Sequence, residues 1–254
     1  WTRAPRKGEP DEASFGWGNA NSYRKYYADY RAFLQRPRDV CAEAEPTLHP
    51  GEELGVVSLD LASFYDRIKP TAVIGALKKL CKQHRIPNDE EFWKRLGRIF
   101  GWRWAKDSIP IAELLRDGTP PGGLPQGLVA SGFFSNAYML RFDEAVRDAL
   151  HDDEADLPFA ILDYCRYVDD MRFVVRWQPS KVKEGELTER CTDWINTLLA
   201  KHAKCQECNA AKSEYVPYRD LRSKSGRAAT MELVQRQLSG PIDMEAIEEV
   251  SIAL

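Results

Sequence analysis

Apolar residues recur along the chain in two patterns, which predict an alternation of helices and strands. Spacings of three and four residues predict helices, and short runs rich in β-branched residues predict buried strands. The expected helices cover 21–35, 70–84, 89–106, 131–150, 187–203 and 228–254. The expected strands cover 54–61, 160–168, 171–177 and 213–218. This order is typical of the α+β class, with an antiparallel sheet and helices packed on one face.

The connections and the faces of the longest helix can also be predicted. Gly and Pro are dense in 117–127, which predicts a loop. We expect 36–53 to be a connector and 1–20 to be a loop or the remnant of a preceding element. The apolar stripe of the helix 131–150 consists of Phe134, Tyr138, Phe142, Ala145 and Ala149. The residues predicted to point away from this stripe are Asp143, Glu144 and Arg147.

Composition places the chain among ordinary globular proteins. Its 254 residues suffice for one large domain or two modest ones, with 43% hydrophobic and 30% charged residues. No run approaches the roughly 18 apolar residues of a membrane span, and no signal-peptide pattern opens the chain, so we expect a cytoplasmic protein without membrane contact. The chain begins at Trp1 rather than Met, and we expect it to be a piece of something longer.

The distribution of charge says more about partners than the net charge of −3. Residues 67–106 hold 11 Lys and Arg against three acids, a balance of +8. Residues 141–170 hold three basic residues against ten acids, a balance of −7. A basic block beside an acidic one predicts a surface that binds phosphates and a separate group of carboxylates. The alternative for the basic block is a solvated helix face.

The six cysteines are too sparse for a disulfide scaffold, which favours reduced thiols. Cys205 and Cys208 have the spacing of a zinc-ligand pair, with His202 nearby, but a second ligand pair is not evident. Ordinary buried thiols are therefore the favoured interpretation.

Three aspartates are the candidate metal ligands. Asp60 ends the predicted strand 54–61, and Asp169 and Asp170 occupy the tip of a predicted hairpin. If strand and hairpin pair in one sheet, the three carboxylates converge, and two Mg²⁺ ions, or Mn²⁺, would neutralise them. Two such ions are the arrangement that supports nucleotidyl transfer. The simpler alternative is that Asp169 and Asp170 only form a turn.

Four segments, in order, resemble the palm motifs of reverse transcriptases. They are DLASFYD at 60–66, GLPQGLVASGFFSNAYML at 123–140, YVDD at 167–170 and AKS at 211–213. The resemblance spans residues 54–216 and is strongest to divergent bacterial groups that include abortive-infection and other defence-associated reverse transcriptases. It implies a right-hand polymerase palm with partial fingers and little or no thumb.

The resemblance implies a catalytic role for several of these residues. Asp60 and Asp169 look like metal ligands, and Asp170 like the second acid of the pair. The backbone carbonyl of Leu61 would be a further metal contact. Lys212 resembles the lysine that gives a proton to the departing pyrophosphate, although a lone lysine is ordinarily a solvated surface residue.

Other residues would contact the nucleotide by the same resemblance. Tyr65 falls at the position of an aromatic steric gate that leaves no room for a 2′-hydroxyl, which implies a deoxynucleoside triphosphate (dNTP) as substrate. Gln126 resembles a residue that packs on the incoming nucleotide or the templating base, and Gly127 lets the backbone approach closely. The alternatives are a core aromatic for Tyr65 and a purely structural Gly/Pro loop.

The expected organisation follows from the motifs. Residues 1–53 would be an N-terminal or fingers remnant with a helix, and 54–218 the palm, with fingers-side helices inserted at 70–106. Residues 219–254 would be a helical segment and the start of a thumb. The expected partners are an RNA template or noncoding RNA, a DNA product and dNTPs, with an oligomer or further defence subunits as additional candidates.

Three functions are open at this stage. The favoured one is an RNA-directed DNA polymerase, a nucleotidyltransferase that adds dNTPs to a 3′-hydroxyl in bacterial antiviral (anti-phage) defence. The second is an RNA-dependent RNA polymerase, for which an acid rather than Tyr65 is expected five residues after Asp60. The third is a palm-fold RNA-binding scaffold in a defence complex, which would not require intact carboxylates.

Overall fold

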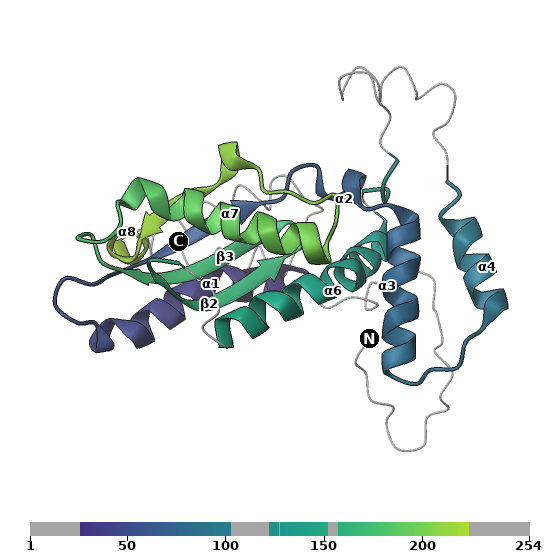
Figure 1. Cartoon of the computed structure of the whole chain (residues 1–254), viewed down its shortest axis with the longest axis horizontal. Helices are drawn as coiled ribbons and strands as arrows, with labels where there is room; N and C mark the ends of the chain where they lie inside the picture. The colour runs from purple at the N-terminus through teal and green to yellow at the C-terminus, as the bar shows by residue number, and fades with distance from the viewer. Residues whose placement is uncertain (1–25, 103–121, 127, 152–156, 224–254) are drawn as a thin grey trace, which may run out of the picture.

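Figure 1 shows the computed structural model, which describes residues 26–102, 122–126, 128–151 and 157–223. Outside these ranges lie the predicted loop 1–20, the end of the predicted helix 89–106, most of the predicted loop 117–127 including Gly127, and the predicted helix 228–254.

Four strands form one antiparallel sheet, in the order β2-β3-β1-β4. They are β1 (Glu53–Asp60), β2 (Ala160–Tyr167), β3 (Asp170–Trp177) and β4 (Glu214–Pro217). All four lie within a residue or two of the predicted runs, because each run is short, apolar and rich in β-branched residues. Sheet and helices together confirm the α+β class.

The predicted helices within the described ranges occur in the predicted order, with differences in length, and the one-turn helix α2 was not predicted. The helices are α1 (Tyr26–Ala44), α2 (Phe64–Arg67), α3 (Pro70–Gln83), α4 (Glu90–Ile99), α6 (Val129–His151), α7 (Glu184–His202) and α8 (Tyr218–Ser223). Short 3₁₀ turns cover Glu45–Thr47 and Ala210–Lys212. Within the described ranges, every helix is too short or too polar to cross a bilayer.

The main core lies between one face of the sheet and helices α6 and α7. Side chains alternate between the faces of a strand, so Val57 and Leu59 of β1 share this face and are almost fully buried. Tyr138 and Phe142, from the predicted apolar stripe of α6, belong to the same core. The α7 residues buried there recur at helical spacing: Leu187, Cys191, Ile195 and Leu199.

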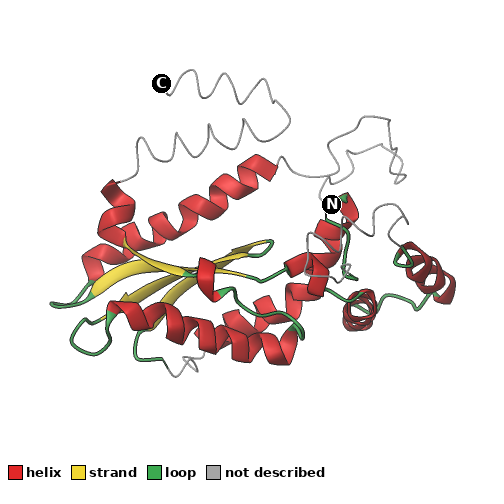
Figure 2. Cartoon of the chain, turned by 90° about the horizontal axis from the view of Figure 1, so that it is seen from above, coloured by secondary structure: helices red, strands yellow, loops and turns green. Residues whose placement is uncertain are grey.

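The opposite face of the sheet is covered by α1, as Figure 2 shows from above. A smaller cluster of Cys41, Leu54, Val56 and Val174 is buried between α1 and this face. Helix α8 contacts the same side through Leu221. The prediction of helices on one face alone is therefore wrong, because the alternate residues of β1 and β3 are also apolar and require a cover.

Helix α1 also extends through the first half of the predicted connector 36–53, despite Pro37 inside it. Proline has no N–H to donate to the carbonyl four residues earlier, which here belongs to Phe33. The thiol of Cys165 on β2 lies 3.9 Å from that carbonyl oxygen and donates to it. Next to the proline, Arg36 binds both carboxylate oxygens of Asp163 on β2, at 2.6 and 2.7 Å. Contacts with the sheet thus hold a helix that its local sequence does not favour.

Helices α3 and α4 lie side by side beyond one end of α6, away from the sheet (Figure 1). Pro70 occupies the first turn of α3, as predicted, and Asp89 caps α4 by accepting a hydrogen bond from the Phe92 N–H. Trp93 of α4 is buried, and the Lys78 ammonium lies 5.4 Å from the centre of its ring.

Candidate active site

The end of β1 and the β2–β3 hairpin bring three aspartates together. Asp60, the last residue of β1, lies directly opposite Asp170, the first residue of β3. Opposite Cβ atoms in an antiparallel pair are about 5 Å apart. Asp169 lies in the two-residue turn between β2 and β3, and its carbonyl accepts a 3.1 Å hydrogen bond from the Leu61 N–H. The hairpin tip is therefore attached to the end of β1.

Like charges meet at this point. Burial raises the pKa of the Asp169 carboxyl, and the carboxylates of Asp170 and Asp60 raise it further. Its own backbone N–H and the ammonium of Lys212 act in the opposite direction. The direction of the shift shows that neighbouring negative charge and lost hydration outweigh the local donors.

Lys212 and Asn209 approach Asp60 from the segment before β4. Nζ of Lys212 lies 3.5 Å from Oδ2 of Asp60, and Nδ2 of Asn209 donates to the same oxygen at 3.4 Å. The Asn209 N–H also donates to the Asp60 carbonyl at 2.7 Å. The Lys212 side chain is 67% exposed, so it reaches the cluster from solvent and can leave it. The structure thus places Lys212 beside Asp60.

The donor set suits a hard cation, because Mg²⁺ and Mn²⁺ prefer carboxylate and carbonyl oxygens. Asp60, Asp169, Asp170 and the Leu61 backbone all supply oxygens where β1 ends and β3 begins. No three His, Cys, Asp or Glu side chains in the described ranges are already gathered as a metal-ligand set. The residues therefore offer the oxygen ligands that such a cation prefers. Their side chains lie near one another but are not arranged as a complete metal site.

Tyr65 lies in α2, next to the loop that contains Gly123 and Leu124. The Leu124 N–H donates to the Tyr65 carbonyl at 2.8 Å. A Cβ atom on Gly123 would run into the carbonyl oxygens of Tyr65 and Asp66. The loop can pack this closely on α2 only because residue 123 is glycine. The Tyr65 ring is half-buried against the main core, so its core contacts and a gate role are compatible.

The loop continues into α6 through Pro125 and Gln126. Gln126 is exposed, and Gly127, the other predicted nucleotide contact, lies outside the described residues. The Ser131 hydroxyl donates to the Pro125 carbonyl at 2.6 Å, and the Trp102 indole N–H donates to the Gly123 carbonyl at 3.1 Å. These bonds, with that from Leu124 to Tyr65, hold the loop beside α2 just before Gln126.

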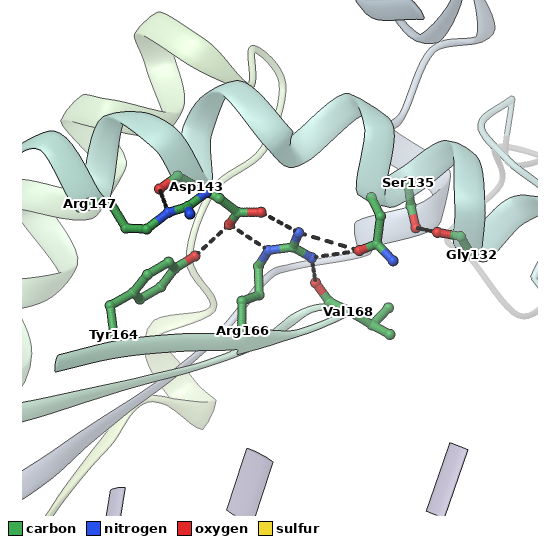
Figure 3. Close-up of polar contacts among 8 residues, drawn as sticks. Gly132, Ser135, Asp143, Arg147, Tyr164, Arg166 and Val168 are labelled. Atoms are coloured by element: carbon green, nitrogen blue, oxygen red, sulfur yellow. Dashed lines mark hydrogen bonds and ion pairs between the residues drawn. The ribbon is translucent and has the colours of Figure 1, made fainter. Parts of the chain in front are cut away.

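A polar network that the sequence pattern did not predict joins the β2–β3 hairpin to α6 (Figure 3). Arg166 of β2 binds both oxygens of Asp143 on α6, at 2.9 and 2.7 Å. Asp143 was predicted to point away from the core, but its side chain is only 17% exposed. A helical pattern assigns a charged residue to solvent by default, and it contains no information about a partner 23 residues later.

Asn209 was also missed. It stands two residues before the AKS segment, and its neighbours Glu207 and Cys208 pair with Ala62 and Leu61. A single asparagine in a loop has no pattern of its own, so only the pairing of these two segments identifies it.

Cys205, Cys208 and His202 are not gathered as a metal-ligand set within the described ranges. Burial, together with Asp60 and Glu207, raises the pKa of the Cys208 thiol to about 12. Cys205 is exposed, and its backbone is in the left-handed region with φ 77°.

Comparisons with known proteins give distant similarities only. No protein-family model matches the chain, and no curated protein matches it. One similar solved structure is apo telomerase from Candida tropicalis, truncated from the C-terminal domain, with 14% identity and a TM-score of 0.40 over 76% of this chain and 35% of that one. Another is telomerase from the same organism in complex with a TWJ fragment of telomeric RNA, with 15% identity and a TM-score of 0.38 over 76% and 29%. The chain thus spans about a third of the length of these structures.

Proposed function

We propose that this chain carries the catalytic palm of a reverse-transcriptase-type DNA polymerase, a nucleotidyltransferase that extends a 3′-hydroxyl with dNTPs. The observation that carries the proposal is the meeting of Asp60, Asp169 and Asp170 at one edge of the sheet, with Lys212 beside them. A turn-forming role for the aspartate pair would not require a third carboxylate opposite it. The geometry therefore favours a site over a simple turn.

The arrangement of the four motif segments supports the same conclusion. Asp60 is paired with Asp170, Tyr65 is bonded to the loop at Leu124, and Lys212 contacts Asp60. Segments that lie up to about 150 residues apart in the chain thus surround one small region. Resemblance in sequence order alone does not demand this convergence.

The proposed reaction is an in-line displacement at phosphorus. The primer 3′-hydroxyl gives its proton to water as its oxygen forms a bond to the α-phosphorus of the dNTP, the bond from that phosphorus to the bridging oxygen breaks, and pyrophosphate leaves. Two Mg²⁺ ions bound by Asp60, Asp169 and Asp170, with the Leu61 carbonyl, would stabilise charge on the attacking and leaving oxygens; Mn²⁺ is the alternative. Lys212, whose side chain is 67% exposed, would give a proton to the departing pyrophosphate.

Tyr65 favours deoxyribonucleotides over ribonucleotides. Its ring packs against the core, and its backbone carbonyl is bonded to Leu124 in the loop before α6. A 2′-hydroxyl approaching the ring would therefore meet a rigid neighbour. An RNA polymerase of the second kind would place an acid at this position, and Asp66 is one residue later. RNA as template and a setting in bacterial antiviral defence rest on the sequence resemblance.

The test is dNTP incorporation by the full chain on a primed RNA template, with Mg²⁺ or Mn²⁺. Asp169→Asn is expected to abolish incorporation, because an amide is a poor replacement for an ionised ligand. Asp193→Asn makes the same change at an exposed position of α7 and should leave the rate unchanged.

Three outcomes separate the alternatives. Undiminished synthesis by the Asp169→Asn variant would overturn the mechanism. Preferential use of rNTPs by the wild-type chain would favour an RNA polymerase, whereas Tyr65→Ala should gain rNTP use if the gate assignment is right. Binding of RNA without synthesis under any of these conditions would favour a scaffold.

A further inference from the structure

The turn that carries Asp169 is held in a conformation that its own residues do not favour. Only Val168 and Asp169 connect β2 to β3, and Val168 has φ 57°, in the left-handed region. A β-branched side chain is rare there, because its branches crowd the backbone. Contacts from elsewhere in the fold must therefore hold the turn.

Arg166 makes the contact that does so (Figure 3). One arm of its guanidinium, Nη1, donates to the Val168 carbonyl at 2.7 Å. Nε and Nη2 donate to Oδ1 and Oδ2 of Asp143 at 2.9 and 2.7 Å. The Arg166 side chain is only 6% exposed, so these bonds face little competition from water.

Other polar groups fix the guanidinium from the side of α6 and β2. The Tyr164 hydroxyl donates to Oδ1 of Asp143 at 2.8 Å, and both Nη atoms of Arg166 lie 3.3 Å from Oδ1 of Asn136. Burial, with Asp143 nearby, keeps the pKa of Tyr164 well above its usual value, so the hydroxyl remains a donor. Burial acts to lower the pKa of Arg166, but the hydrogen bonds and the charge of Asp143, together with Tyr164, outweigh it in sum and raise the pKa.

We propose that Arg166 is a positioning residue that clamps the Val168–Asp169 turn to α6 and thereby holds Asp169 beside Asp60. The same helix starts directly after the loop that contains Gln126, and Ser131 bonds that loop at Pro125. Helix α6 thus holds in place both the Val168–Asp169 turn and the loop that contains Gln126. The consequence for catalysis rests on the proposed function; the consequence for the turn does not.

Lysine cannot replace arginine in this role. The guanidinium is a planar fork that serves Val168, Asp143 and Asn136 in three directions at once, whereas an ammonium is a single point on a flexible stem. Arg166→Lys therefore keeps the charge next to Asp143 but loses the bond that fixes the turn. This makes it a sharper probe than alanine, which would leave Asp143 buried without a cation.

The structural half is tested by amide hydrogen exchange on the metal-free full chain. The Leu61 N–H donates to the Asp169 carbonyl, so it reports whether the turn keeps its place. In Arg166→Lys, Leu61 should exchange about tenfold faster, the fold-change that corresponds to leaving one buried group without its hydrogen bond. Val57, in the centre of the sheet, should be unchanged, as should both amides in Arg190→Lys, which alters an exposed arginine of α7.

Unchanged exchange at Leu61 in a folded Arg166→Lys protein would overturn the proposal. If Val57 also exchanges faster, the whole sheet has loosened, and Asn136→Ala decides instead. This variant removes only the exposed acceptor on α6, at a helical position that favours alanine, and should accelerate Leu61 to a smaller extent. If Leu61 exchanges no faster in Asn136→Ala than in wild type, that result counts against the proposal that Arg166 clamps the turn to α6.

Activity gives a second, independent readout. Arg166→Lys should lower kcat about 10- to 100-fold and raise the Mg²⁺ concentration needed for half-maximal rate, with little change in KM for dNTP. A purely structural role would lower the amount of folded enzyme. The kcat of each folded molecule and its Mg²⁺ dependence would then be unchanged. If the wild-type chain incorporates no nucleotide, the proposed function fails, while the exchange of Leu61 still decides the clamp.

Discussion

Among single residues, Asp169 carries a buried charge that opposes the stability of the fold. Its carboxyl has a raised pKa because it is buried near Asp170 and Asp60. A group of this kind stabilises the folded state only while it is protonated. That contribution is complete below the ordinary pKa of aspartate and is lost as pH rises through the folded-state value.

Asp169→Asn should therefore raise the melting temperature of the metal-free protein at neutral pH, because the neutral amide removes a buried like charge. The difference from wild type should shrink as the pH falls toward the usual aspartate pKa of 3.8, where the wild-type carboxyl becomes neutral too. Thermal unfolding in EDTA across this pH range measures both effects, with Asp193→Asn as control. A melting temperature below that of wild type at pH 7 would contradict the assigned electrostatics.

Gly123 is a residue whose importance is steric. An added Cβ would meet the backbone of α2, at Tyr65 and Asp66, rather than a flexible side chain. Gly123→Ala should lower the free energy of unfolding by about 1–3 kcal/mol. Gly97→Ala, in α4 with open space around it, should raise the same quantity by about 0.5–1 kcal/mol. Denaturant titration of both variants tests the contrast, and equal effects would mean that the loop does not pack on α2 as described.

The residues of the candidate site fall into two groups, those that the sequence pattern predicts and those that it does not. Asp60, Asp169 and Asp170 could be predicted because each ends a strand-like run, and strand ends are where a sheet exposes polar groups. Arg166 and Asn209 could not, because their roles come from partners in other elements. For Arg166 that partner is Asp143, on a helix whose pattern gives no reason to keep an acid near the sheet.

At the scale of elements, α3 and α4 concentrate positive charge beyond one end of α6. The exposed basic side chains of this helix pair include Lys78, Lys79, Lys82, Lys94, Arg95 and Arg98. Exposed apolar residues, Phe92 and Ile99, lie among them on α4. Arg95 is paired with Glu91, but most of the charge faces solvent in a chain whose net charge is −3. This surface is the natural candidate for contact with nucleic-acid phosphates.

If this surface binds phosphates, Lys79→Gln with Lys82→Gln should weaken binding of single-stranded RNA and flatten its salt dependence. Each lost phosphate contact should reduce the slope of log K against log salt by about 0.7. Lys181→Gln with Lys201→Gln removes two exposed charges elsewhere and should change neither quantity. Fluorescence anisotropy at several salt concentrations provides both slopes. Identical slopes for the two double variants would identify the basic face as merely solvated.

For the whole molecule, the fold consists of one central sheet with two unequal covers. Local periodicity was enough to predict the strands and most helices, because burial of each element follows from its own pattern. It was not enough to place α1. The bonds that fix this helix join Arg36 to Asp163 and Phe33 to Cys165, more than 120 residues apart, and no pattern within 21–53 encodes them.

The two covers should also differ in stability. Helix α1 buries its face in the small cluster around Cys41, whereas α6 and α7 share the main core with Cys191. Both thiols are fully buried, and burial raises the pKa of Cys41 to about 12. Labelling of either thiol therefore requires opening of the structure around it. Release of α1 would expose Cys41 alone, while exposure of Cys191 requires the loss of the main core.

A thiol reagent under native conditions should consequently modify Cys41 faster than Cys191, as measured by mass spectrometry of the labelled peptides. Arg36→Ala removes the ion pair between α1 and β2; since Arg36 is more than half exposed, the pair contributes little, and labelling of Cys41 should rise roughly two- to fivefold. Cys191 should keep its wild-type rate, as should both thiols in Arg190→Ala, which breaks an exposed pair within α7. Equal labelling of the two thiols in wild type, or acceleration of both by Arg36→Ala, would show that α1 and the main core open as one unit. By alternation along β1 and β3, Asp60 and Asp170 belong to the same face as Val56 and Val174, which α1 covers. Faster labelling of Cys41 alone would instead mean that this face can be uncovered while the sheet that aligns the two aspartates stays intact.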